Sequence, residues 1–176
     1  MNGSIIKENT AWFKRILTYI VENRRVLVAW GILFLIIMLY LSRALWYLNN
    51  NPLTPDAITH YLPYARNVME QGLTYFTTLE SINVAPVSYL WVALFNSDAI
   101  IIRYVNLITG VFSLLLVYGV GRQIHSVAVG LIAAFLFARS PLLIHWIPTV
   151  LSEPPFYLFT LLWLWATGSI LLNKNK

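Results

Sequence analysis

One carboxylate, Asp56, stands where it could act on a lipid-linked substrate, just beyond a long apolar stretch of the chain. It falls in the first turn of a predicted helix, in which Thr54 is the cap and Pro55 takes the first helical position. A carboxylate in this place can act as a general base, taking a proton from an acceptor hydroxyl as that hydroxyl attacks an activated carbon. The alternative is an acid that only complements the helix dipole.

A second carboxylate, Glu153, follows Ser152 where another apolar stretch begins. We expect it on the same side of the membrane as Asp56, where it could support the base. Helix starts favour serine followed by an acid in any case, so capping is the alternative explanation.

Three arginines are candidates for binding a lipid phosphate: Arg66, Arg103 and Arg139. Arg139 would lie about 18 Å along a predicted span, at 1.5 Å per residue, and intramembrane arginines usually face a cavity or an anionic partner. The planar guanidinium donates several hydrogen bonds to a phosphate. Anchoring at the interface is the alternative for Arg66 and Arg103, and snorkelling to the interface is the alternative for Arg139.

No metal site or other cofactor is expected. The chain has no cysteine, and its three histidines lack ligand spacing. A divalent cation held by Asp56, Glu80 and Asp98 is left open, because hard cations need several convergent oxygens and nothing in the sequence fixes their convergence. There is also no glycine loop for a phosphate and no nucleic-acid-binding pattern.

The elements that position these residues are predicted to be membrane helices. The chain is 59% hydrophobic and 11% charged, with a mean hydropathy of +0.67, which is typical of an all-α, multi-pass membrane protein and excludes an ordinary soluble domain. Since about 20 residues cross a bilayer, we predict four spans in one membrane domain of residues 26–172. The spans are residues 26–47, 104–121, 127–147 and 155–172.

The distribution of basic residues predicts the orientation of the spans. Most lysines and arginines, eight of the twelve, fall at the two ends of the chain or at Arg122, so both termini are expected in the cytoplasm. Residues 1–25 then form a cytoplasmic amphipathic segment, residues 173–176 a cytoplasmic tail, and residues 48–103 an extracytoplasmic loop. Within the loop we predict an interfacial amphipathic helix that starts at Thr54, is kinked by Pro63 and ends at Gly72.

The order of these features along the chain resembles the amino-terminal part of the GT-C glycosyltransferases. It resembles especially the group that holds the protein O-mannosyltransferases and the aminoarabinose transferase of lipid A. The matching features run from the loop helix to the last span. They are Asp56, Tyr61, Ala65-Arg66 and Gly72, then Ala85-Pro86-Val87-Ser88-Tyr89-Leu90, Arg103 and Gly110, Gly121-Arg122, Gly130-Leu131-Ile132-Ala133-Ala134, Ser140-Pro141 and Ser152-Glu153.

The resemblance implies sugar transfer from a polyprenyl-phosphate donor to an acceptor at the extracytoplasmic face. It assigns the base to Asp56 and a supporting role to Glu153, and it adds Tyr61 to the substrate-binding arginines. The sequence departs from the family where Ala57 replaces a second acid and Val84 replaces a lysine.

Family members also carry more spans than the four predicted here. We therefore expect a truncated module that works with a partner membrane protein supplying further spans. The alternative is a non-catalytic membrane scaffold or accessory subunit with the same fold.

Overall fold

The computed structural model describes residues 23–78, 86–146 and 149–173. The predicted N-terminal segment 1–25 and tail 173–176 are described only at residues 23–25 and 173; the rest of both, with Glu80 and Val84, lies outside the described residues. The chain divides into two units, residues 1–35 and 36–176. In the first unit, the described residues form the beginning of helix α2 (Arg24–Asn50), which is apolar and mostly exposed.

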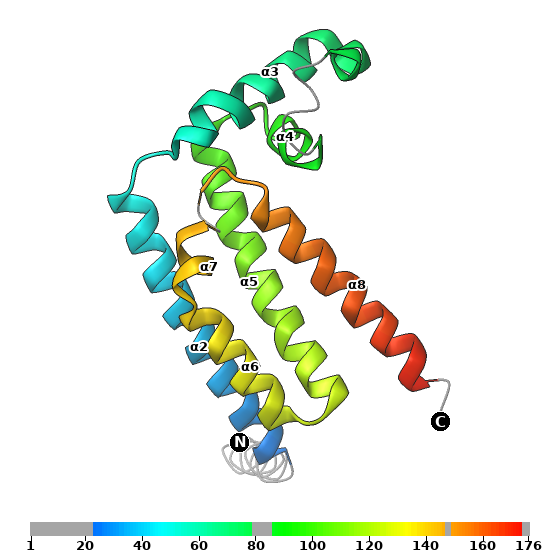
Figure 1. The fold of residues 1–176 in the computed structure, drawn as a ribbon. Helices are drawn as coiled ribbons and strands as arrows, with labels where there is room; N and C mark the ends of the chain where they lie inside the picture. The colour runs from blue at the N-terminus through cyan, green and yellow to red at the C-terminus, as the bar shows by residue number, and fades with distance from the viewer. Residues whose placement is uncertain (1–22, 79–85, 147–148, 174–176) are drawn as a thin grey trace, which may run out of the picture. The chain divides into compact units, whose positions relative to one another are not determined.

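Helices make up all regular structure in the described residues, which confirms the predicted all-α fold (Figure 1). Three helices are long and apolar enough to cross a membrane: α2, α5 (Ala99–Ile124) and α8 (Glu153–Asn173). They correspond to the first, second and fourth predicted spans. The α5 helix begins before the predicted residue 104, because the Asp98 carboxylate accepts hydrogen bonds from the backbone N–H groups of Ile100 at 2.8 Å and Ile101 at 3.1 Å.

The third predicted span, residues 127–147, is not one helix. Helix α6 (Val127–Arg139) ends before Ser140, and the short α7 (Pro141–Trp146) follows it. Pro141 disfavours helical backbone at the residue before it, and Ser140 has the extended ψ of 121° that this predicts. The 13 residues of α6 rise only about 20 Å, so this helix alone is shorter than the roughly 30 Å hydrocarbon core.

The long helices of the second unit pack through small residues. Helices α5 and α6 form a hairpin in which a Cβ built on Gly121 would lie 2.8 Å from the Cα of Gly130, so any side chain at Gly121 would meet backbone. Helix α8 also packs along α5. There, Gln123 donates a hydrogen bond to the Ser169 hydroxyl at 2.8 Å, beside Gly168.

The predicted loop between the first two spans is also helical, and it lies where α5 begins (Figure 1). Thr54 caps its first helix as predicted, since the Thr54 hydroxyl accepts a hydrogen bond from the N–H of Ala57 at 3.3 Å. Gly72 ends that helix as predicted, with a φ of 61°. The elements of the loop are η1 (Ala57–Tyr61), α3 (Leu62–Gln71), η2 (Gly72–Thr77) and α4 (Pro86–Ala93).

The irregularity that we predicted at Pro63 is a widened π turn just before it, in η1. The N–H of Leu62 donates to the carbonyl of Ala57, five residues back, instead of four. Pro63 has no N–H with which to continue an α-helical ladder, and π turns and prolines are common causes of helix bending. The helix therefore continues through Pro63 without ending.

Three tyrosine rings form the core that holds these loop helices together. Tyr64 of α3, Tyr75 of η2 and Tyr89 of α4 lie with ring centroids 5.9 to 6.1 Å apart in each pair. Ala57 and Ala65 are fully buried in the same cluster, as are Ile102 of α5 and Val150 before α8. Because this core joins η1, α3, α4, α5 and the chain before α8, it fixes the start of α8 next to the predicted loop helix.

Candidate functional site

Glu153 and Tyr61, two predicted site residues, are joined through Ser152. The Tyr61 hydroxyl donates to the Ser152 hydroxyl at 3.5 Å, and Ser152 donates to a carboxylate oxygen of Glu153 at 3.4 Å. Both hydrogen bonds are long, so they orient the side chains more than they stabilise the fold. All three side chains are partly buried. The structure thus places a carboxylate and two hydroxyls at the start of α8, next to η1.

A cavity of ≈ 450 Å³ opens beside Glu153. Its polar lining comes from Ser88 of α4, from Ser152 and Glu153, and from Thr160 one to two turns along α8. Val87, Phe156 and Phe159 supply the apolar lining. A pocket of a few hundred Å³ with few convergent polar groups is typical of a small-molecule site. A carboxylate among hydroxyls can accept a hydrogen bond, and then a proton, from a substrate hydroxyl.

The buried side chain of Asn106 links α4 to the chain before α8, and both border the Glu153 cavity. Asn106 of α5 is fully buried, and its side-chain oxygen accepts a hydrogen bond from the indole N–H of Trp91 on α4 at 2.9 Å. Its amide nitrogen donates to the carbonyl of Thr149 at 2.6 Å. Both ends of the amide are therefore used, as a buried polar group requires. The sequence did not single out Asn106, although an asparagine inside an apolar span is itself a signal of a polar contact.

Asp56 is exposed and makes no side-chain cap hydrogen bond. It lines neither the Glu153 cavity nor the cavity between α2 and α7. It precedes Tyr61 by five residues on the same helical segment. The structure joins Tyr61, and not Asp56, to Glu153 by hydrogen bonds. The role of Asp56 as the base stays a prediction.

The three predicted arginines lie in different places. Arg66 is exposed on α3, and Arg139 is exposed at the end of α6, where the predicted continuous span is broken. Arg103 is partly buried, and its Nη2 donates to the carbonyls of Leu48 at 2.6 Å and Asn51 at 2.8 Å. Arg103 therefore fastens the last turn of α2 to the first turns of α5.

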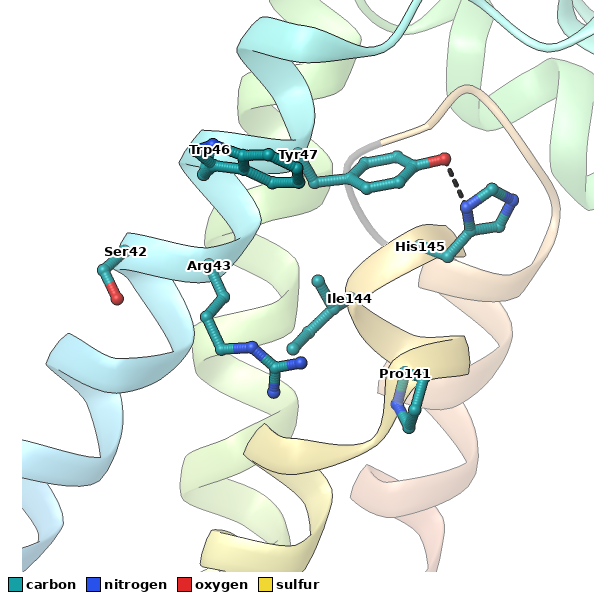
Figure 2. Close-up of a pocket in the computed structure, with 7 residues that line it drawn as sticks. All are labelled: Ser42, Arg43, Trp46, Tyr47, Pro141, Ile144 and His145. Carbon is teal, nitrogen blue, oxygen red and sulfur yellow. Dashed lines mark hydrogen bonds between the residues drawn. The ribbon is translucent and has the colours of Figure 1, made fainter.

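A fourth arginine, Arg43, was not singled out from the sequence. It lines a cavity of ≈ 710 Å³ between the end of α2 and α7, shown in Figure 2. The signal that could have found it is its position as the first charge after the uncharged run 26–42. Its neighbours across the cavity depend on the break at Ser140, which the sequence analysis had treated as part of a continuous span.

Burial raises the pKa of the Tyr89 hydroxyl in the tyrosine core above its ordinary value, because the phenolate would lose its solvation there. Tyr89 therefore stays neutral under ordinary conditions and serves as packing for the site.

No group of three or more histidine, aspartate and glutamate side chains within residues 23–78, 86–146 and 149–173 is arranged to hold a metal ion. The expectation that the site needs no cofactor is not tested by this.

Comparison with known protein families gives a match for the second half of the chain. A family model described as dolichyl-phosphate-mannose-protein mannosyltransferase matches residues 83–176, more than half of the chain. The chain belongs to this mannosyltransferase family. Comparison with curated proteins and with solved structures gives no match.

Membership of this mannosyltransferase family confirms the predicted resemblance to GT-C glycosyltransferases and, with the three long apolar helices, a location in the membrane. The match covers α4 to α8, and so includes Arg103, Arg139 and Glu153. It begins after Asp56, Tyr61 and Arg66. The Glu153 cavity is thus built mainly from the part of the chain that matches the family.

Proposed function

We propose that this chain takes part in sugar transfer from a polyprenyl-phosphate donor to an acceptor hydroxyl, at the extracytoplasmic face of a cell membrane. The observation that carries the proposal is the cavity beside Glu153, where a carboxylate and three hydroxyl side chains meet at the end of a membrane-length helix. Family membership supplies the reaction class.

In the proposed reaction, an acceptor hydroxyl attacks the anomeric carbon of the lipid-linked sugar. A new carbon–oxygen bond forms, the bond from that carbon to the phosphate oxygen breaks, and the polyprenyl phosphate leaves. The carboxylate takes the proton of the acceptor hydroxyl. Arg66, Arg103 and Arg139 remain proposed phosphate ligands, and their positive charge beside the departing phosphate would stabilise the negative charge that develops on it.

Two carboxylates compete for the role of base. Glu153 is partly buried, lines the cavity and is oriented by Ser152. Asp56 is exposed and lies on the helix that carries Tyr61. The geometry favours Glu153 as the group beside the acceptor, with Asp56 as the second candidate. Helix α8 leaves most of its apolar surface exposed, so further membrane helices, from the same polypeptide or a partner chain, are proposed to complete the site.

The test is turnover of a polyprenyl-phosphate sugar in membranes that contain the full chain. We expect Glu153→Gln to lower turnover by roughly 10² or more, the usual contribution of a general base. Glu70→Gln, at an exposed acid of α3, is the matched control and should leave turnover unchanged. A loss with Asp56→Asn but not with Glu153→Gln would transfer the role to Asp56. Equal turnover in all three variants and the parent would favour a non-catalytic scaffold.

A further inference from the structure

A second cavity lies away from Glu153, between α2 and α7 (Figure 2). Its volume is ≈ 710 Å³, and its lining is mostly apolar, with Trp46 and Ile144 among the residues that form it. Among the described residues, Arg43 and His145 are the basic residues that line it, and no acid does. The cavity therefore combines an apolar wall with a positive charge.

Arg43 is held in this cavity by the end of α6. Its Nη1 donates to the carbonyl of Arg139 at 3.2 Å and to that of Ala138 at 3.5 Å, which are among the last carbonyls of the helix. Figure 2 shows the side chain extending from α2 into the space beside Ile144 and Pro141. Its Nε and Nη2 make no hydrogen bond to the part of the chain that the structure describes, so they can donate to a ligand in the cavity.

The opposite wall is fixed by a contact between α2 and α7. The Tyr47 hydroxyl and Nδ1 of His145 are hydrogen-bonded, and the two rings meet edge to face with centroids 4.9 Å apart. This contact keeps α7 beside α2 even though Ser140 separates α7 from α6. The cavity is thus a built feature, walled by two elements that are bonded to each other.

The position of Arg43 along α2 decides what kind of ligand suits the cavity. Residues 26–42 carry no charge, and Arg43 is followed within one turn by Trp46 and Tyr47. Aromatic residues at the end of an apolar run are typical of the boundary between hydrocarbon and headgroups. A ligand at this depth has an apolar tail on one side and a headgroup on the other.

We propose that this cavity binds an anionic phospholipid of the surrounding bilayer, with the phosphate on the free N–H groups of Arg43 and an acyl chain along Trp46 and Ile144. An arginine fork matches phosphate oxygens, and such charge-assisted hydrogen bonds are the strong ones. The bound lipid would join α2, the end of α6 and α7 at the point where the third predicted span is broken. The proposal does not depend on the sugar transfer proposed above.

The test is native mass spectrometry of the full chain in detergent, titrated with phosphatidylglycerol or with phosphatidylcholine. We expect one phosphatidylglycerol to bind more tightly than phosphatidylcholine, and Arg43→Gln to weaken its binding about tenfold, the loss of one charged hydrogen bond. Arg122→Gln, at an exposed arginine near the far end of α5, should bind phosphatidylglycerol as the parent does.

A second variant guards against a folding defect in Arg43→Gln, because Arg43 also caps α6. Trp46 is exposed and lines the same cavity, so Trp46→Ala removes part of the apolar wall while it keeps the charge. It should weaken phosphatidylglycerol binding as well. The proposal is overturned if both variants bind phosphatidylglycerol like the parent, or if phosphatidylcholine binds as tightly as phosphatidylglycerol.

Discussion

Gly130 of α6 lies directly against the backbone of Tyr118 on α5. A Cβ built on Gly130 would stand 2.5 Å from the Tyr118 carbonyl oxygen and 3.0 Å from the backbone nitrogen of Arg122. Backbone atoms in the middle of a helix cannot rotate away as a flexible side chain can. The close approach of α5 and α6 therefore requires glycine at position 130, and the hairpin that leads to Arg43's partners on α6 depends on it.

We expect Gly130→Ala to destabilise the chain by about 1–3 kcal/mol, the usual cost of overpacking, because α5 and α6 must separate to accept the methyl group. The thermal unfolding midpoint in detergent, followed by far-ultraviolet circular dichroism, measures this effect. Gly31→Ala is the matched control, since a Cβ at Gly31 has no atom within 4 Å. Alanine there should leave the midpoint unchanged or raise it slightly, given its higher helix propensity. Equal midpoints for both variants would refute the close contact.

The buried Asn106 gives a second prediction. Asn106→Leu keeps the size of the side chain but removes its hydrogen bonds to Trp91 and Thr149. We expect a loss of about 1–3 kcal/mol in the free energy of unfolding, because the indole N–H and the carbonyl lose the amide that satisfies them in a buried place. Asn49→Leu, at an exposed asparagine of α2, should cost much less in the same unfolding measurement. A stabilised Asn106→Leu variant would contradict the assignment.

Local signals in the sequence were sufficient for much of the fold. The Thr54 cap and the Gly72 end were predicted because each depends on residues within one turn of it. The family was predicted because the features of its members occur in the same order along this chain, and the family match confirms it. The break at Ser140 was missed as a helix end, although Pro141 was noted, because the apolar pattern continues on both sides of it.

Contacts between distant segments could not be predicted in this way. Arg43 meets α6 across more than 90 residues of chain, and Tyr61 meets Ser152 across a similar separation. The spacing of the two residues in the sequence does not indicate either contact, because each contact depends on how the helices pack. Arg103 shows the same limit, because nothing in the sequence indicated the two backbone carbonyls, one in α2 and one just after it, to which its guanidinium donates.

Arg103 supports a third prediction, on local dynamics. We expect Arg103→Gln to speed amide hydrogen exchange at residues 49–56, because the guanidinium no longer holds the carbonyls of Leu48 and Asn51 and the end of α2 frays. Arg66→Gln, at an exposed arginine of α3, is the control and should leave exchange in this segment unaltered. Mass spectrometry of peptides from the exchanged chain gives the rates. Unchanged exchange in the Arg103 variant would show that the hydrogen bonds from Arg103 do not hold this segment.

The tyrosine core leads to a prediction about alkaline stability. Burial raises the pKa of Tyr89 in the folded chain, whereas unfolding returns the hydroxyl to its ordinary value of 10.0. Below that pH both states keep the proton, so the full contribution of this group to stability is present. Above it the unfolded chain loses the proton first, and the free energy of unfolding falls as the pH rises towards the folded-state pKa. Tyr89→Phe should therefore lose less stability than the parent between about pH 8 and about pH 11.

The comparison uses the change in unfolding midpoint with pH, and not its absolute value, because the substitution also alters packing in the core. Tyr104→Phe, at an exposed tyrosine of α5, is the matched control for the removal of one hydroxyl. Both variants keep an aromatic ring, so the contacts between rings are largely preserved in each. If Tyr89→Phe loses as much stability at high pH as Tyr104→Phe, the alkaline sensitivity comes from another group, and Tyr89 is not the residue whose burial resists ionisation.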